Sequence, residues 1–127
     1  ATPYMDLIDE FTLREMVHFH FKLKKLRDGL QVDDLFVHMY LEEAADKQLI
    51  NFSSGMKQRL KLALAFFTDA DIYFLDEPGT NLDSRAFAWY RANLAQLPQQ
   101  AMVFIASNNP EEYPESATAL NIMDFKR

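Results

Sequence analysis

The sequence predicts an α/β fold, with a helical N-terminal part followed by a small parallel-sheet βαβ portion. Residues 1–50 carry apolar side chains at helical spacing, and two short apolar runs lie at residues 72–75 and 102–106. An amphipathic segment separates the two runs. A strand, a helix and a strand within about thirty residues form a βαβ unit, whose strands are parallel and whose crossover is right-handed.

Length and composition are those of one globular domain or less. The chain has 127 residues, of which 49% are hydrophobic and 25% charged, which excludes a disordered tail. The net charge of −6 argues against binding to a nucleic-acid backbone. The chain has no cysteine, so disulfides and thiolate metal sites are excluded. No apolar run approaches the roughly 20 residues of a membrane-spanning helix.

Two helices are expected within residues 1–50. Thr12 and Glu15 have the spacing of a capping box, in which a hydroxyl and a carboxylate satisfy free N–H groups at a helix start. This helix is expected to end at Gly29, after a basic last turn. A second helix is expected over residues 33–47. Its apolar stripe would consist of Phe36, Met39 and Tyr40.

A polar loop over residues 51–55 precedes a third predicted helix, which begins at Met56. Small residues and free N–H groups at a helix start favour a bound phosphate, so Ser53 to Gly55 are a possible anion site. A helix cap with a flexible turn is the alternative interpretation.

The apolar run over residues 72–75 has the composition of a strand buried on both faces, and it stops at Asp76 and Glu77. Acids in this position lie at the carboxyl edge of a parallel sheet, where open α/β sheets bind ligands. A carboxylate at a buried strand end is poorly hydrated, and a hard cation is one of few partners that stabilise it. Solvated loop acids before a proline are the alternative.

The remaining elements follow in order. Asp83 is a suitable N-cap for a helix over residues 84–97. Its inner face would consist of Phe87, Tyr90 and Leu94. The second strand is expected over residues 102–106, a short helix near residues 111–113, and a last strand near residues 119–125.

Three segments in this order resemble motifs of the ATP-binding-cassette (ABC) ATPases. Residues 52–56 resemble the signature loop, residues 74–78 the Walker B strand with its following glutamate, and residues 79–83 the D-loop. The order and spacing also fit. The resemblance implies an incomplete P-loop NTPase (ABC ATPase) fold. Residues 1–55 would be its helical subdomain, and residues 56–127 the C-terminal part of its nucleotide-binding core, with the switch region.

The resemblance also implies roles for individual residues in a two-protomer ATP sandwich. Asp76 would hold Mg²⁺ through its water shell, and Glu77 would act as general base on the attacking water. Asp83 would signal across the dimer and border the bound ATP. The signature loop would contact the γ-phosphate of ATP held by the other protomer; its residues are Phe52, Ser53, Ser54, Gly55 and Met56.

The sequence departs from the family pattern in three places. No G-x-x-x-x-G-K-[ST] phosphate loop (Walker A) occurs, so we expect this chain alone to bind ATP very weakly and not to hydrolyse it. Asn108 stands where the family has its switch histidine; an amide can donate to a phosphate but cannot carry a proton charge. A helix cap before Pro110 is an equal alternative for Asn108. No glutamine occupies the Q-loop position, and the signature loop has Ser54 for the usual Gly and Met56 for the usual Gln.

These features together predict a fragment of the ATP-binding subunit of an ABC transporter. The expected partners are a second ABC ATPase protomer and a membrane-spanning subunit, which would hold the protein at the cytoplasmic face of the membrane. A non-transport ABC-type ATPase and a catalytically dead interaction module are the alternatives. The strand at residues 72–75 would lack a neighbour, so the isolated chain is expected to self-associate. The three histidines, His18, His20 and His38, are expected to be structural or on the surface.

Overall fold

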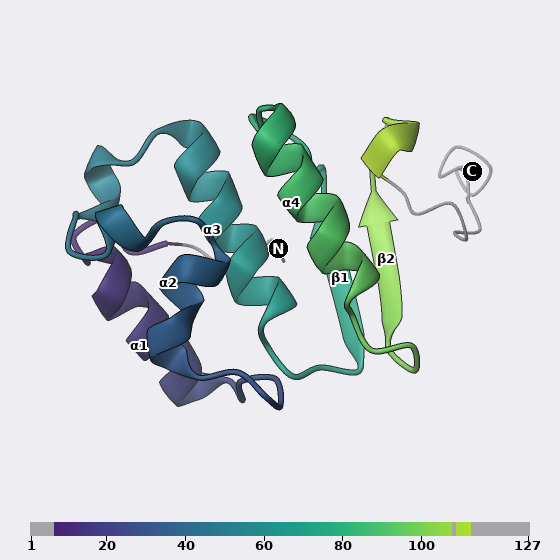
Figure 1. Ribbon diagram of the computed structural model, residues 1–127, viewed down its shortest axis with the longest axis horizontal. Helices are drawn as coiled ribbons and strands as arrows, with labels where there is room; N and C mark the ends of the chain where they lie inside the picture. Colours follow the sequence, from purple (N-terminus) through teal and green to yellow (C-terminus); the bar gives the residue numbers. More distant parts are fainter. Residues whose placement is uncertain (1–6, 108, 113–127) are drawn as a thin grey trace, which may run out of the picture.

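The computed structural model describes residues 7–107 and 109–112 (Figure 1). Its elements, with η for 3₁₀-helices, are α1 (Leu13–Leu23), η1 (Val32–Asp34), α2 (Leu35–His38), η2 (Glu42–Ala44), η3 (Leu49–Asn51), α3 (Ser54–Phe66), β1 (Ile72–Asp76), α4 (Ser84–Ala95), β2 (Met102–Ala106) and η4 (Pro110–Glu112). The helical part precedes a βαβ unit, which confirms the predicted α/β class. The strand predicted near residues 119–125 lies outside the described residues.

Helix α1 begins at the predicted capping box. The Thr12 side chain accepts a hydrogen bond from the Glu15 N–H at 3.1 Å, and the Glu15 carboxylate accepts one from the Thr12 N–H at 2.8 Å. The helix then turns its apolar side, with Leu13 and Val17, into the core. The local pattern and the burial agree here, so the start of the helix could be predicted from the sequence.

The end of α1 differs from the prediction. The helix stops at Leu23 instead of Gly29. Beyond that point the chain runs beside the end of α3, where the Arg27 N–H donates to Phe67 O at 2.8 Å and the Arg27 guanidinium donates to Phe66 O at 3.0 Å. These tertiary hydrogen bonds satisfy carbonyls at the C-terminus of α3, and they replace the helical bonds that residues 24–28 would otherwise make.

The single helix predicted over residues 33–47 is wrong, because this segment forms η1, α2 and η2. The interruption lies at Tyr40, whose φ of 59° is in the left-handed region. The Leu41 N–H then donates to Phe36 O at 2.9 Å and closes the end of α2. Phe36, Met39 and Leu41 are buried, whereas Tyr40 is exposed. The turn therefore buries Leu41 at the expense of a longer helix.

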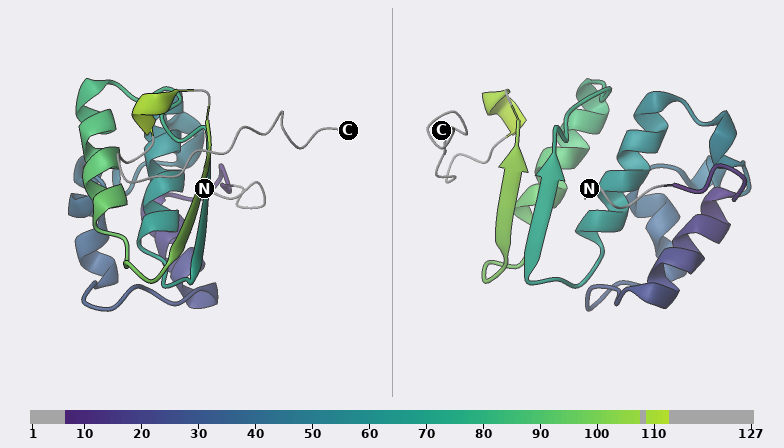
Figure 2. Two further views of the ribbon diagram at one scale, coloured as in Figure 1. Left: turned by 90° about the vertical axis from the view of Figure 1, so that its right-hand side faces the viewer. Right: turned by 180° about the vertical axis from the view of Figure 1, so that it is seen from behind.

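Strands β1 and β2 pair in parallel, in a register that matches Ile72 with Met102 and Asp76 with Ala106. The predicted parallel pairing is confirmed. Helices α3 and α4 lie on one side of the strands (Figure 2). A hydrogen bond connects α4 to the helical part: the Trp89 indole N–H donates to His38 O at 2.6 Å.

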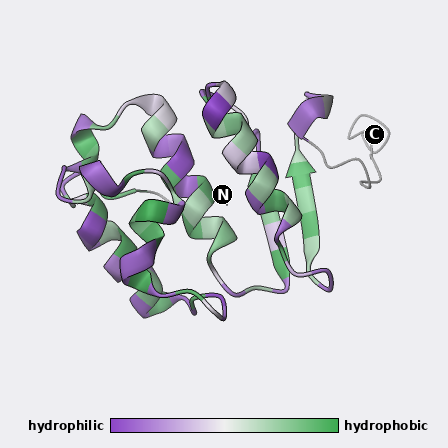
Figure 3. Cartoon of the chain, viewed as in Figure 1, coloured by the Kyte–Doolittle hydropathy of each residue, from purple (hydrophilic) through white to green (hydrophobic). Residues whose placement is uncertain are grey.

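Strand β1 is buried on one face only, which corrects the prediction of burial on both. Tyr73 and Leu75 are 4% and 0% exposed, whereas Ile72 and Phe74 are 59% and 40% exposed. Within the described residues, β1 pairs with β2 on one edge, and the helices cover the face of Tyr73 and Leu75. The two strands are hydrophobic along most of their length (Figure 3). An apolar sheet face is therefore left open in this part of the chain.

None of the helices among the described residues has the length and hydrophobicity needed to cross a membrane.

Candidate functional site

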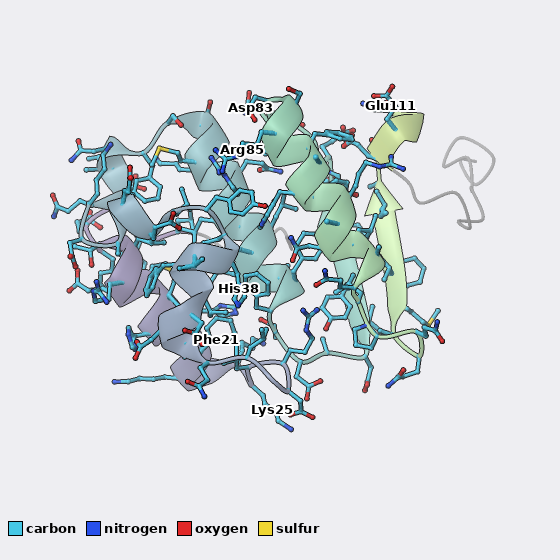
Figure 4. All side chains as sticks on the ribbon, in the orientation of Figure 1. Phe21, Lys25, His38, Asp83, Arg85 and Glu111 are labelled. Carbon is cyan, nitrogen blue, oxygen red and sulfur yellow. The ribbon has the colours of Figure 1, made fainter. Side chains whose placement is uncertain are left out.

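The predicted site residues that the structure describes gather at one end of the molecule. The strands β1 and β2 run toward this end, and α3 and α4 begin there (Figure 1). Asp76 is the last residue of β1, and Ser53 is the N-cap of α3. Asp83, labelled in Figure 4, is the N-cap of α4. The carboxylates therefore emerge at the carboxyl edge of the parallel strands, as predicted, beside two helix N-termini.

The signature segment forms the start of α3. The Ser53 hydroxyl oxygen accepts a hydrogen bond from the Met56 N–H at 3.1 Å, so its O–H remains available as a donor. Ser54 and Gly55 lie in the first turn of the helix, not in a loop before it, which corrects the predicted start at Met56. The Phe52 side chain is buried in the core, so this residue supports the turn by packing.

A recess of about 210 Å³ joins the start of α3 to the segment before α4. Arg59 lies in it with its Nε buried, and no described residue provides a hydrogen-bond partner for that atom. A guanidinium beside a helix N-terminus favours an anion, because both present N–H donors and positive charge. The lining residues are Ser53, Gly55, Met56, Arg59, Asn81, Asp83 and Ala86.

Asp76 and Glu77 are both exposed, so the expectation of a poorly hydrated acid is wrong. The open sheet face and the surface position of the turn leave both carboxylates in contact with solvent. Among residues 7–107 and 109–112, neither carboxylate makes a hydrogen bond or ion pair. The Glu77 backbone has φ 45°, and its N–H donates to Ala106 O at 2.7 Å.

The exposed carboxylates of Asp76 and Glu77 suit Mg²⁺ better than a cation that is enclosed by protein ligands. The described residues contain no group of three or more His, Cys, Asp or Glu side chains that could hold a metal. Mg²⁺ in nucleotide sites keeps several waters and takes only one or two carboxylates, with the phosphates of the substrate completing its shell. An exposed Asp76 at the strand end meets that requirement.

Two side chains that the sequence did not single out hold the turn after β1. The Gln58 amide of α3 donates to Pro78 O at 3.1 Å and to Glu77 O at 3.4 Å. From η4, the Glu112 carboxylate accepts the Gly79 N–H at 2.7 Å. The spacing of Gln58 within the signature segment could have drawn attention to it, whereas no local pattern marks Glu112.

Asn108 lies outside the described residues, so its proposed switch role stays a prediction. The neighbouring Asn109 caps η4, because its side-chain oxygen accepts the Glu111 N–H at 3.0 Å. Asp83 caps α4 in a similar way, because its carboxylate accepts a hydrogen bond from the Ala86 N–H at 2.8 Å.

Comparison with known proteins gives consistent results. Residues 4–81 match the family model described as ABC transporter. Phospholipid-transporting ATPase ABCA3 of Homo sapiens is 31% identical over 127 residues, which cover 95% of this chain and 7% of that protein. The uncharacterized ABC transporter ATP-binding protein YybJ of Bacillus subtilis (strain 168) is 30% identical over 109 residues, which cover 85% of this chain and 50% of that protein. The chain therefore spans half or less of these relatives.

Solved structures show the same fold. A putative ABC transporter (ATP-binding protein) from Pyrococcus furiosus superposes with a TM-score of 0.67 at 19% identity, over 84% of this chain and 54% of that one. The family model covers more than half of this chain, and its curated relatives are ABC transporters or their ATP-binding proteins. The chain belongs to the ABC transporter family, as a segment of its ATPase domain.

Proposed function

We propose that this chain supplies the signature and Walker B portion of an Mg²⁺-dependent ATPase that drives transport across a membrane. The observation that supports this best is the position of Asp76 and Glu77 at the carboxyl end of β1, at the same end of the fold where α3 begins (Figure 1). Catalysis of phosphoryl transfer depends mainly on positioning and charge neutralisation, and this end of the fold presents residues for both.

The N-terminus of α3 would bind the γ-phosphate of ATP whose other phosphates lie on a second protomer. The Ser53 O–H and the backbone N–H groups of Ser54 and Gly55 are suitable donors, since the first N–H groups of a helix have no partner within it. The guanidinium of Arg59 adds positive charge in the same recess. Because the site is divided between protomers, hydrolysis would depend on their closure.

The two carboxylates would act together on the ATP held by the phosphate loop of their own protomer. Asp76 would hold Mg²⁺ through its water ligands, and the bound metal would neutralise charge on the phosphate oxygens. Glu77 would orient the attacking water and accept its proton as general base. Both side chains are exposed, so they can reach a nucleotide bound at this end of the fold.

The proposal includes two macromolecular partners. A second ABC ATPase protomer would complete the site, because the signature loop of one protomer would contact the ATP held by the other. A membrane-spanning subunit would convert closure into transport and keep the protein at the cytoplasmic face of the membrane.

The test is ATP hydrolysis by the assembled ATPase, which combines this chain with a phosphate-loop portion. We expect Glu77→Gln to lower kcat by about 10²- to 10⁴-fold while ATP binding persists, because only the proton acceptor is removed. Glu43→Gln, an exposed acid in η2, is the matched control and should keep wild-type kcat.

Two results would contradict the proposal. Wild-type hydrolysis by the Glu77→Gln protein would remove the general-base role. Turnover by the purified 127-residue chain, abolished by Glu77→Gln, would show that the absent phosphate loop is not required.

A further inference from the structure

Glu112 is a buried carboxylate to which the proposed mechanism assigns no role. It is 3% exposed, and both of its carboxylate oxygens accept hydrogen bonds. One oxygen accepts the Gly79 N–H at 2.7 Å, and the other accepts the Ser107 hydroxyl at 2.6 Å. Its backbone carbonyl accepts the Tyr90 hydroxyl at 2.6 Å. Contacts on both carboxylate oxygens and on the backbone fix the position of this side chain, and hydrogen bonds to an ionised acceptor are the stronger kind.

The carboxylate lies tightly against the turn that follows Glu77. A Cβ added to Gly79 would lie 2.9 Å from Glu112 Cδ and 2.8 Å from Phe87 Cε2. Contacts this short leave no room for a side chain, so the backbone of Gly79 packs directly on Glu112. The Glu112 side chain and the Gly79 backbone are therefore in direct contact, and the 2.7 Å hydrogen bond joins them.

The turn needs such support because its backbone is strained. Glu77 has φ 45°, a left-handed conformation that residues other than glycine rarely adopt. Such conformations persist where surrounding contacts enforce them. Here Glu112 holds the N–H at one end of the turn, and Gln58 of α3 holds the Pro78 carbonyl.

We propose that Glu112 is a positioning residue for Glu77. Through the Gly79 N–H it fixes the backbone of residues 77–79, and the backbone in turn sets the direction of the Glu77 carboxylate. The η4 segment that carries Glu112 is thereby linked to the general base. The inference rests on the proposed role of Glu77, and it adds a residue that never touches the nucleotide.

The experiment compares two replacements of Glu112 in the assembled ATPase. Glu112→Met keeps the length of the side chain and removes both acceptors, so kcat should fall by about 10- to 100-fold while KM for Mg-ATP changes by less than about threefold. Glu112→Gln keeps an acceptor for the Gly79 N–H and can donate its amide to Ser107, so it should restore most of the wild-type kcat. Glu111→Met, at the exposed neighbouring acid, should leave kcat unchanged.

A second readout follows the hydrogen bond itself. In the 127-residue chain, amide hydrogen exchange at Gly79 should accelerate by at least about tenfold in Glu112→Met and stay near wild type in Glu112→Gln. If Glu112→Met does not fold, Glu112→Asp replaces it. That variant keeps the charge but draws the carboxylate one methylene back from Gly79, and the same loss of kcat is expected.

The possible failures can be told apart. Wild-type kcat in Glu112→Met, or in Glu112→Asp where that variant is used, overturns the positioning role if Glu77→Gln is inactive in the same assay. Equal losses in Glu112→Gln and Glu112→Met also overturn it, because the Gly79 hydrogen bond would then not be the cause. Full activity of Glu77→Gln overturns the proposed function itself, and the inference with it.

Discussion

Gly55 and Asn81 approach so closely that a Cβ on Gly55 would lie 2.8 Å from the backbone oxygen of Asn81. Gly55 lies in the first turn of α3, and Asn81 lies between β1 and α4 with a left-handed φ of 65°. The family resemblance assigns this glycine to phosphate contact. The structure gives a second, local reason for it, because the start of α3 packs directly on the backbone that precedes α4.

This contact predicts a cost for Gly55→Ala. The added methyl group must displace the Asn81 backbone, which should lower the free energy of unfolding by about 1–3 kcal/mol, although alanine is the better helix former. Urea denaturation of the 127-residue chain measures this. Ser54→Ala, one residue earlier and exposed, should change stability by no more than about 0.5 kcal/mol. Equal stability of the wild-type protein and the Gly55→Ala protein would show that the two segments separate readily.

Asp83 is predicted to stabilise the fold independently of any nucleotide. Its carboxylate caps α4, so Asp83→Ala should lower the free energy of unfolding by about 1 kcal/mol, whereas Asp83→Asn should keep most of it. Thermal unfolding of the three proteins at neutral pH distinguishes these cases. A loss of stability as large in the asparagine variant as in the alanine variant would indicate that the charge matters, and not the cap.

His20 should make stability depend on pH. Burial lowers the pKa of His20 to about 4, and repulsion from Lys24 adds to the shift. The hydroxyl of Thr68 donates to Leu64 O, so its oxygen accepts from the His20 Nε2–H at 2.8 Å. The unfolded chain binds this proton near pH 6.5 and the folded chain only near pH 4.

The direction of the pH dependence of stability follows from this difference in proton binding. The neutral His20 side chain makes its full contribution to the free energy of unfolding above about pH 6.5. About 3 kcal/mol of this free energy is lost as the pH falls toward 4. Chemical denaturation at several pH values should show a steeper loss in the wild-type protein than in His20→Gln, which cannot be protonated. Identical slopes for the two proteins over this range would rule out the buried neutral imidazole.

The isolated chain is predicted to self-associate through its open sheet face. Phe74 and Phe104 are paired in register and exposed on that face, beside the similarly paired Ile72 and Met102. Phe74→Lys should therefore shift the chain toward monomer, because a charge at the centre of an apolar contact opposes its burial. Val37→Lys, an exposed apolar position in α2, is the control and should leave association unchanged.

Light scattering as a function of concentration provides the measurement. A well-behaved monomer of the wild-type chain at high concentration would count against this prediction.

Local patterns predicted the parts of the fold that local interactions determine. The capping box of Thr12 and Glu15, the cap at Asp83 and the parallel pairing of the two apolar runs all agree with the structure. Each depends on residues close in sequence or on a strand–helix–strand order that permits one arrangement. The placement of Asp76 at the strand end followed from the same order.

Features that depend on distant contacts could not be predicted in this way. Helix α1 ends at Leu23 because residues 25–27 bond to the end of α3, and the second predicted helix breaks at Tyr40 so that Leu41 can be buried. The support of the turn after β1 by Glu112 joins residues 33 positions apart, so no local spacing marks it. The one-sided burial of β1 likewise reflects what packs on it, which its own composition does not reveal.

The left-handed backbone of Glu77 implies that fold stability and the proposed catalytic role favour different residues at this position. Glycine adopts φ 45° with less strain, so Glu77→Gly should raise the free energy of unfolding. The same variant should lose hydrolysis, because it lacks the proton acceptor. The side chain at this position therefore supplies the carboxylate that the proposed reaction needs, at a cost in backbone strain.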